Sequence, residues 1–323
     1  MDKKLLWDTH GNGEQLFAIR TVNIASGPQK GLGIIELENG SGLALDILPD
    51  NGLDIGKVRY KGIPMAWISK NGYTKPNSGE NFRDYFSGGI LYTCGLSNVG
   101  PACNEGGYEH ALHGRFHKLG ASNICTDIVD DRFIVSGWIT ESTQYGVHMA
   151  VKRTIEVPLF ANRIKVTDTI ENRSASNADL MLLYHMNFSY PLVSENTELI
   201  LPPDTASRAR DAESKKGFAD RYRFSKPVAG CPEQVFYHDV PKPMACIQNK
   251  ALGVAVHLNW SKDTLPKLIE WKSMGTGEYA LGVEPGNCLV DGKLTHKQRG
   301  EILQLQGYAS IDCRVEIAFE DMA

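Results

Sequence analysis

Three short segments of the sequence place a titratable side chain within or beside an apolar stretch. The side chains are His113, His185 and Glu284, in segments 111–115, 184–188 and 282–287. Glu284 ends an apolar stretch immediately before Pro-Gly, where lost solvation would raise the pKa of the carboxyl toward a range useful to a base. His185 lies inside an apolar run, where a hydrogen bond on one ring nitrogen can hold a single tautomer. These residue types could take a proton from one substrate atom and give a proton to another.

Each of these residues also has an ordinary structural interpretation. A histidine in a core strand is more often a buried, hydrogen-bonded residue than a catalyst. A carboxylate at the end of a strand can serve only as a turn partner. The pattern alone leaves both interpretations open for His113, His185 and Glu284.

The segments around these residues have the pattern of β-strands. Residues 180–188 form a nearly continuous apolar run, which predicts a strand buried on both faces. Short or alternating apolar stretches bounded by turn residues recur along the chain, at 33–37, 43–48, 132–140, 148–157, 163–172, 251–260, 279–284 and 313–320. Helical periodicity is scarce, and residues 206–218 read as a long loop or a short surface helix. The sequence therefore predicts an all-β fold, a large antiparallel β-sandwich of two sheets.

Length and composition fit one such domain over residues 1–323, with a core at about 30–320. The net charge of −4 and the absence of a Lys/Arg-rich stripe disfavour nucleic acid as a partner. Two lysines near the N-terminus are followed by no apolar segment that would form a signal peptide or a membrane span. We expect no membrane association and a cytoplasmic location. The seven scattered cysteines contain no CxxC pair, which favours buried free thiols.

We expect no metal and no other cofactor. His110, His113 and His117 have a spacing that would align them on one face of a helix, as metal ligands might be. Gly114 and the neighbouring glycines disfavour a helix there, and with it a metal site. The glycine-rich stretches lack the strand–GxGxxG–helix context of a dinucleotide site.

The order of these segments resembles the aldose 1-epimerase (galactose mutarotase-like) family, in which a His-Gly motif, a second His in a core strand and a Glu near the C-terminus follow one another. The similarity is greater to the divergent aldose 1-epimerase-like branch and spans about residues 30–320. The segments that carry it are 52–56, 87–96, 112–115, 184–188, 270–272 and 281–288. The resemblance implies a galactose mutarotase-like supersandwich and interconversion of the α and β anomers of a free or modified aldose.

The resemblance also implies roles for individual residues. Glu284 would take the proton from the anomeric hydroxyl, and His185 would donate a proton to the ring oxygen, so that the ring opens and recloses on the other face. His113 would hydrogen-bond the sugar. Further sugar-binding candidates are Arg83, Asp239, Arg115, Asn187, Trp271 and Lys272. Arg115 and Asn187 match the divergent branch and not the galactose enzymes, so galactose specificity is not implied. Trp67 and Tyr279 could join Trp271 and Lys272 in a wall on which a sugar stacks, or could pack in the core.

Three functional classes remain open from the sequence. The first is the sugar isomerase described above, acting on a small-molecule sugar, with a homodimer left open as its assembly. The second is a protein that binds carbohydrate without turnover. The third is another sugar isomerase, a lyase or a glycosidase on the same fold. A glycosidase usually needs two carboxylates, and Glu284 is the only strong candidate.

Overall fold

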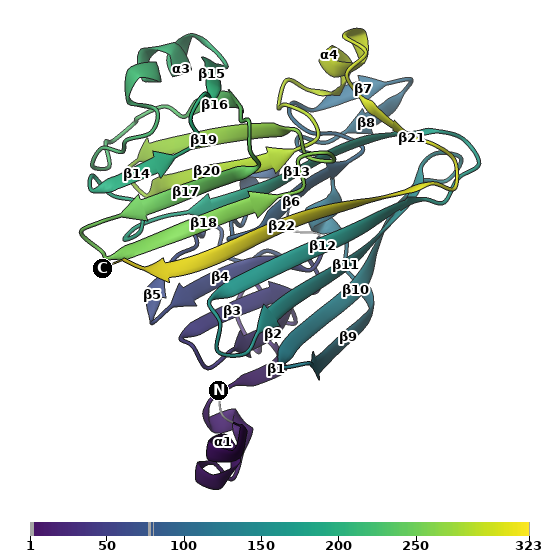
Figure 1. Cartoon of the computed structure of the whole chain (residues 1–323). Helices are drawn as coiled ribbons and strands as arrows, with labels where there is room; N and C mark the ends of the chain where they lie inside the picture. The colour runs from purple at the N-terminus through teal and green to yellow at the C-terminus, as the bar shows by residue number, and fades with distance from the viewer. Residues whose placement is uncertain (1–2, 77–78, 80, 323) are drawn as a thin grey trace.

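The computed structural model describes residues 3–76, 79 and 81–322, and most of its regular structure is antiparallel β-sheet (Figure 1). The largest sheet has eight strands. In spatial order they are β14 (Thr197–Ile200), β17 (Met244–Asn249), β18 (Val254–Trp260), β22 (Ser310–Asp321), β12 (Arg163–Asn172), β11 (His148–Pro158), β10 (Arg132–Ser142) and β9 (Ser122–Val129). The strands predicted at 132–140, 148–157 and 163–172 are confirmed as β10, β11 and β12, which pair in succession as a meander.

A second sheet carries the residues of chemical interest. Its strands, in order, are β15 (Ala206–Ala209), β16 (Gln234–Asp239), β19 (Lys267–Gly275), β20 (Glu278–Gly286), β13 (Ala178–Phe188) and β21 (Leu303–Leu305), and β6 (Tyr92–Leu96) also pairs with β13. Residues 206–218 differ from the sequence-based expectation. They contain the edge strand β15 as well as a short helix, because β15 pairs with β16, about 30 residues further along the chain.

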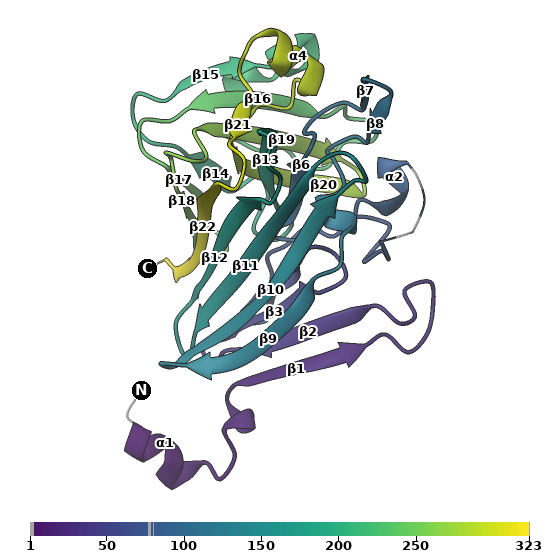
Figure 2. The ribbon, with the colours of Figure 1, turned by 90° about the vertical axis from the view of Figure 1, so that its right-hand side faces the viewer.

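Two smaller sheets and several short helices complete the described chain. A five-stranded sheet consists of β1 (Ala18–Asn23), β2 (Gly33–Glu38), β3 (Leu43–Leu48), β4 (Asp54–Tyr60) and β5 (Ile63–Pro64), and a hairpin consists of β7 (Cys103–Glu105) and β8 (Tyr108–His110). The α-helices are α1 (Lys3–Thr9), α2 (Phe82–Tyr85), α3 (Ala212–Lys216) and α4 (Lys293–Gln298). The 3₁₀ turns are η1 (Gly13–Gln15), η2 (Phe116–Lys118) and η3 (Phe218–Asp220). Helix α1 projects away from the sheets in both ribbon views (Figures 1 and 2).

Strand β13 is buried on both faces, as the apolar run predicts. Leu182, Tyr184 and Met186 face the main core, which includes side chains of the eight-stranded and five-stranded sheets. Met181 and Leu183 face a second, smaller core on the opposite side of the strand. His185 shares this second face, because side chains alternate along a strand. The candidate site is therefore built on the face of the second sheet that points away from the main core.

A buried ion-pair network joins the two large sheets. Arg153 of β11 is fully buried and contacts Asp168 and Asp54, at 2.7 Å in each case, and also Thr93 of β6 at 2.9 Å. Tyr184 of β13 donates to Asp168 at 2.7 Å. A buried guanidinium needs such partners, because an unpaired buried charge is costly. The network fixes β13, which carries His185, and the neighbouring β6 against the eight-stranded sheet.

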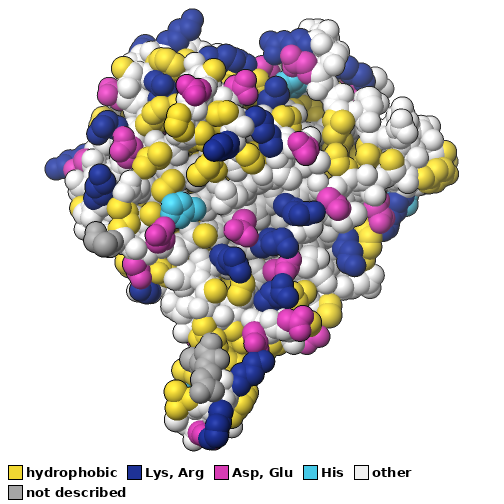
Figure 3. Space-filling model, in the orientation of Figure 1, with side chains coloured by type: hydrophobic (Ala, Val, Ile, Leu, Met, Phe, Trp, Pro, Cys, Tyr) yellow, Lys and Arg dark blue, Asp and Glu magenta, His cyan; other side chains and the backbone are white. Residues whose placement is uncertain are grey.

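The outer surface of the eight-stranded sheet carries lysine and arginine side chains interspersed with aspartate and glutamate (Figure 3). None of the described helices is both long and apolar enough to cross a membrane.

Candidate active site

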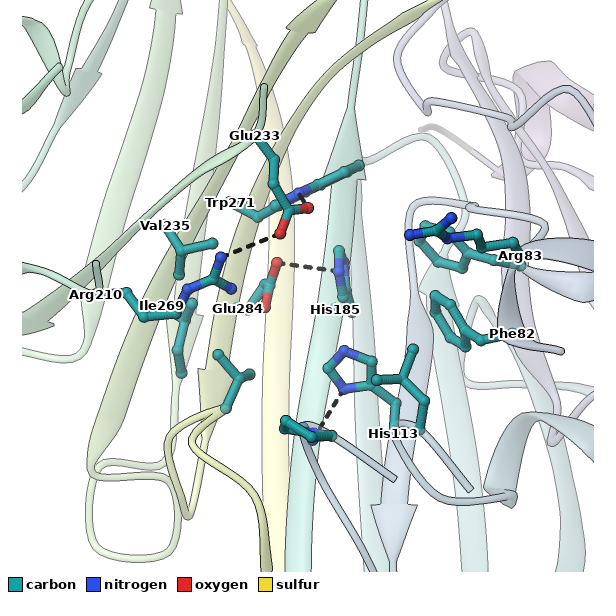
Figure 4. Close-up of a pocket in the computed structure, with 15 residues that line it drawn as sticks. Phe82, Arg83, His113, His185, Arg210, Glu233, Val235, Ile269, Trp271 and Glu284 are labelled. Atoms are coloured by element: carbon teal, nitrogen blue, oxygen red, sulfur yellow. Dashed lines mark hydrogen bonds and ion pairs between the residues drawn. The ribbon is translucent and has the colours of Figure 1, made fainter. Parts of the chain in front are cut away.

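A cavity of about 380 Å³ lies on the face of the second sheet that points away from the main core. Its walls come from distant parts of the chain: α2, the loops around residues 100 and 112, and strands β13, β16, β19 and β20. His113, His185 and Glu284 all line this cavity (Figure 4). The structure thus places the three residues singled out from the sequence in one pocket, although their chemical roles remain predictions.

His185 and Glu284 face each other across neighbouring strands. The register that pairs Met186 of β13 with Val283 of β20 sets His185 opposite Glu284. Cross-strand neighbours of this kind have side chains on the same face of the sheet. The Nε2 atom of His185 lies 3.2 Å from Oε1 of Glu284, and both side chains are buried. The two groups are therefore close enough to interact directly, but in this conformation no hydrogen bond joins them.

Gly282 provides the space that Glu284 occupies. A Cβ atom at position 282 would lie 2.4 Å from Oε1 of Glu284 and 3.0 Å from Cβ of Trp271. Contacts that short do not occur between real atoms, so any side chain at 282 would displace the carboxyl. Glycine in a strand interior often marks such a close approach.

The conformation of the His-Gly segment aims His113 into the pocket. His113 has a left-handed backbone with φ of 59°, and the following Gly114 has φ of 74°. A Cβ atom at Gly114 would lie 2.4 Å from the carbonyl oxygen of Gly95, so glycine is required there. The left-handed turn is unusual for a histidine, and such conformations cluster at functional sites.

The hydrogen bonding of His113 determines what its ring can offer a ligand. The backbone N–H of Gly100 donates to Nδ1 of His113 at 3.3 Å. Burial lowers the pKa of His113 to about 4, so the ring is neutral at neutral pH. A neutral ring that accepts at Nδ1 carries its proton on Nε2. His113 is thus a hydrogen-bond donor in the pocket.

Burial also determines the charge of the central pair. Loss of solvation lowers the pKa of His185 to about 3 and raises the pKa of Glu284 well above its ordinary value. Both shifts favour the uncharged forms, so the pair carries one exchangeable proton, on the Glu284 carboxyl. The Nδ1 atom of His185 and Oε1 of Glu284 have no hydrogen-bond partner among the described residues. Buried polar atoms of this kind often mark functional sites.

Arg210 and Glu233 also line the pocket, and sequence reasoning missed both. Glu233 accepts a hydrogen bond from Trp271 Nε1 at 2.9 Å and one from Arg210 Nη2 at 3.1 Å (Figure 4). The two residues reach the site because β16 pairs Val235 with Trp271 of β19. In the sequence, Arg210 directly follows the β15 segment and Glu233 directly precedes the β16 segment. A charged residue next to a strand is too common to identify a site.

Two of the predicted sugar-binding residues line the same pocket. Arg83 is exposed on α2, and its guanidinium points toward the cavity (Figure 4). Trp271 of β19 is half-buried, and its ring lies 5.4 Å from that of His185. Asn187 is fully buried beside the pocket. Its side chain donates to the carbonyl oxygens of Gly89 and of His185, so it supports the backbone of β13.

The structure places the other three predicted binding residues elsewhere. Lys272 follows Trp271 in β19 and so faces the opposite side of the sheet, where its ammonium donates to the carbonyl oxygens of Asp220 and Arg223. Asp239 is exposed at the end of β16 and lines a separate cavity. Arg115 donates to Glu141 and to the carbonyl oxygen of Ser142. The structure therefore does not bring these three residues into the pocket that holds His185 and Glu284.

The remaining aromatic and histidine candidates are also placed. Trp67 lines an adjoining cavity, whereas Tyr279 belongs to the main core and donates to the carbonyl oxygen of Ser225. His117 is buried and its ring stacks on those of Tyr85 and Tyr92. His110 lies on β8 beside Glu105. Within the described residues, no group of three or more His, Cys, Asp or Glu side chains has the arrangement of a metal site.

Comparison with known proteins gives a family and a fold. The family model described as a domain of unknown function (DUF4432) matches residues 29–319. No protein of curated function matches the chain in sequence.

Several solved structures share the fold. A proposed aldose 1-epimerase from Klebsiella pneumoniae superimposes with a TM-score of 0.89 at 21% identity, covering 96% of this chain and 87% of that one. A galactose mutarotase-like protein from Clostridium acetobutylicum superimposes with a TM-score of 0.66 at 17% identity, covering 95% of this chain and 100% of its own. Galactose 1-epimerase from Lactobacillus acidophilus superimposes with a TM-score of 0.64 at 14% identity, covering 95% of this chain and 100% of that one. The chain thus has the aldose 1-epimerase fold, as its motifs predict, while identities this low leave its chemistry to the site itself.

Proposed function

The chain belongs to the DUF4432 family, and from its pocket geometry we propose that it interconverts the anomers of an aldose by acid–base ring opening. The contact between His185 and Glu284 carries this proposal. In a cyclic sugar, the anomeric hydroxyl and the ring oxygen are bonded to the same carbon. An acid and a base that are themselves neighbours can therefore serve both oxygens at once.

The proposed reaction needs one proton to leave the anomeric hydroxyl and one to reach the ring oxygen. Glu284 is the base and His185 the acid, as the family resemblance implies. Burial favours the proton on Glu284 in the empty site. Transfer of that proton across the 3.2 Å contact gives the carboxylate and imidazolium that the assignment requires. The open-chain aldehyde then rotates, and the reverse transfers close the ring on its other face.

The remaining residues of the pocket would hold the sugar. His113 offers a donor from Nε2 near the reacting pair, as argued from its contact with Gly100. Arg83 offers guanidinium donors from the rim. The Glu233 carboxylate, fixed by Arg210 and Trp271, can accept from a sugar hydroxyl. Charged donors and acceptors on both sides of the pocket suit a polyhydroxylated ligand.

The experiment that tests this proposal is saturation-transfer NMR of anomeric exchange across a panel of common aldoses. We expect exchange faster than the spontaneous rate for at least one sugar. Glu284→Gln and His185→Asn should each lower that rate about 10²–10⁴-fold, since general acid–base catalysis commonly contributes that much. The matched control is Glu320→Gln, at an exposed position of β22 where the carboxylate pairs with His257, away from both the pocket and its surroundings.

Two results would count against the proposal. Near-wild-type exchange in folded Glu284→Gln would remove the base assignment. Binding of a sugar without any acceleration of exchange would instead support a carbohydrate-binding protein.

A further inference from the structure

A second cavity, of about 530 Å³, adjoins the candidate active site on its outer side. The two cavities share five lining residues, Phe82, Arg83, Phe86, Glu233 and Trp271. Only the inner cavity reaches His185 and Glu284, and only the outer one reaches Trp67 and Cys231. The two cavities therefore form one continuous cleft with a reactive inner part and a larger outer part.

Trp271 stands at the boundary between the two parts. Its ring meets that of His185, in the inner cavity, at 5.4 Å and 70°, and that of Trp67, in the outer cavity, at 5.6 Å and 69°. The Trp271 Nε1 atom is fixed by its hydrogen bond to Glu233. An aromatic ring held in place offers a platform for the apolar face of a sugar at little entropic cost.

Arg83 occupies the same boundary from the opposite wall. Its guanidinium forms no ion pair or hydrogen bond with any described residue, and helix α2 orients its backbone through the N-cap of Asn81. Five N–H donors are thus free at the junction of the two cavities. Oxygen atoms in the linkage between two sugar units would lie within their reach.

The charges of the outer cavity favour a neutral occupant. Lys70 is paired with Glu278 at 2.7 Å, and Glu233 is paired with Arg210. The hydroxyl groups of Ser69 and Ser273 donate to backbone carbonyls and so leave their oxygen atoms able to accept. The outer cavity is lined by two cationic and two anionic side chains, those of Lys70, Arg83, Glu233 and Glu278, whose formal charges cancel. An uncharged sugar would meet aromatic rings and balanced polar groups there, with the Arg83 donors free to bind its oxygen atoms.

We propose that the outer cavity is a second sugar subsite, so that the ligand is a reducing disaccharide or a longer reducing oligosaccharide. The reducing-end ring enters the inner cavity, and the next ring lies in the outer cavity between Trp67, Trp271 and Arg83. This inference rests on the proposed function for the identity of the reacting ring, but the outer subsite itself is a binding site that can be measured separately.

The test compares neutral disaccharides with monosaccharides and then blocks the outer cavity alone. The exchange rates and dissociation constants of maltose, cellobiose and isomaltose are compared with those of glucose, and those of lactose and melibiose with those of glucose and galactose. Cys231, which lines only the outer cavity, is then modified with N-phenylmaleimide. Because Cys103, Cys125 and Cys246 are also at least partly accessible, Cys231→Ser treated in the same way is the matched control.

We expect kcat/KM and affinity to be about tenfold or more higher for at least one disaccharide than for its monosaccharide. The reason is that an aromatic platform contributes about 1.4 kcal/mol to the binding free energy, which corresponds to a factor of ten. Modification of Cys231 should abolish this advantage, leave monosaccharide exchange within about twofold and have no such effect on the Cys231→Ser control. Equal values for every disaccharide and its monosaccharide would overturn the outer subsite while leaving the proposed function intact. If modification of Cys231 lowered kcat/KM equally for monosaccharides and disaccharides, the outer subsite would also be overturned. If no sugar shows accelerated exchange, the proposed function fails, and the binding comparison alone decides the subsite.

Discussion

His185 of β13 and Glu284 of β20 lie opposite each other on the face of the second sheet that points away from the main core. Nε2 of His185 lies 3.2 Å from Oε1 of Glu284. Each is buried, and each is shifted toward its uncharged form. The contact makes them one titrating unit with a shared proton, since groups this close do not lose protons independently. Several expectations depend on this relationship.

The shared proton predicts an asymmetric pH profile. The state with one exchangeable proton on the pair is the active one. It gains a second proton only as pH falls toward the pKa of His185, about 3, and loses its proton only when pH exceeds the raised pKa of Glu284. We expect kcat/KM to fall as pH rises through the raised pKa of Glu284 and to be insensitive to acid until pH approaches the pKa of His185. The measurement is kcat/KM for anomeric exchange from pH 5 to 10. A loss of kcat/KM that begins as pH falls below 7, in a protein that remains folded, would contradict the shared-proton assignment.

Gly282→Ala should reduce catalysis while preserving the fold. The new methyl group would clash with the Glu284 carboxyl at 2.4 Å and push it away from His185. Misplacing a catalytic group by about 1 Å can cost about 10²-fold in rate. We expect kcat to fall by about that factor, with an unchanged far-ultraviolet circular dichroism spectrum. The control is Gly120→Ala, where the nearest heavy atom would be at an ordinary 3.9 Å. Unchanged kcat in Gly282→Ala would show that the carboxyl does not need its present position.

Arg83→Ala should raise KM strongly, whereas Asp239→Ala should leave it nearly unchanged. Arg83 borders the cavity and has a free guanidinium, so its removal should raise KM about tenfold or more with little change in kcat, as for loss of a hydrogen bond made in both ground and transition states. Asp239 lines a different cavity, so its removal should leave both parameters within about twofold. Steady-state exchange kinetics of the two variants test this. A KM effect in Asp239→Ala larger than in Arg83→Ala would contradict the structural assignment.

The three buried histidines should lower the stability of the protein as pH falls below about 6.5. Burial lowers the pKa of His113 to about 4 and those of His117 and His185 to about 3, from 6.5 in the unfolded chain. The stability that depends on these groups is fully present above pH 6.5 and is lost as pH falls toward these values, because only the unfolded state then binds the protons. Each histidine contributes up to about 1.4 kcal/mol per pH unit. Buried carboxyls act in the opposite direction, because burial raises the pKa of Asp54 to about 6 and also raises those of Glu270 and Glu284, so the histidine contribution is measured one residue at a time.

The variant His117→Phe isolates one of these contributions. The new ring can keep the stacking on Tyr85 and Tyr92 but cannot take a proton. Between pH 7 and 5 we expect its unfolding free energy to fall by about 2 kcal/mol less than that of the wild type. Urea denaturation at both pH values measures this. His148→Phe, at an exposed position, is the control. An identical pH dependence in wild type and His117→Phe would refute the attribution to His117.

The sequence by itself determined most of the strands and singled out the three residues that meet in the candidate site. Apolar runs and turn residues suffice to locate the strands, because period-two alternation and continuous burial are local properties of the chain. The run at 180–188 predicts a doubly buried strand, and β13 is one. A His within that run and a Glu before Pro-Gly are unusual enough to be noticed without coordinates. Alternation places Trp271 and Lys272 on opposite faces of β19, although both were expected to bind the sugar.

Only the tertiary structure decided which of the other polar residues belong to the site. Arg210 and Glu233 reach the pocket through the pairing of β15 with β16 and of β16 with β19, in which the paired residues lie about 30 to 40 positions apart in the sequence. Asp239 is excluded because it lies four residues beyond Val235 on the same strand, about 13 Å away at about 3.3 Å per residue. The contact between His185 and Glu284 likewise depends on the β13–β20 register, in which a shift of one residue would place either side chain on the opposite face. Strand order and register arise from packing across the whole domain, and no local pattern in the sequence encodes them.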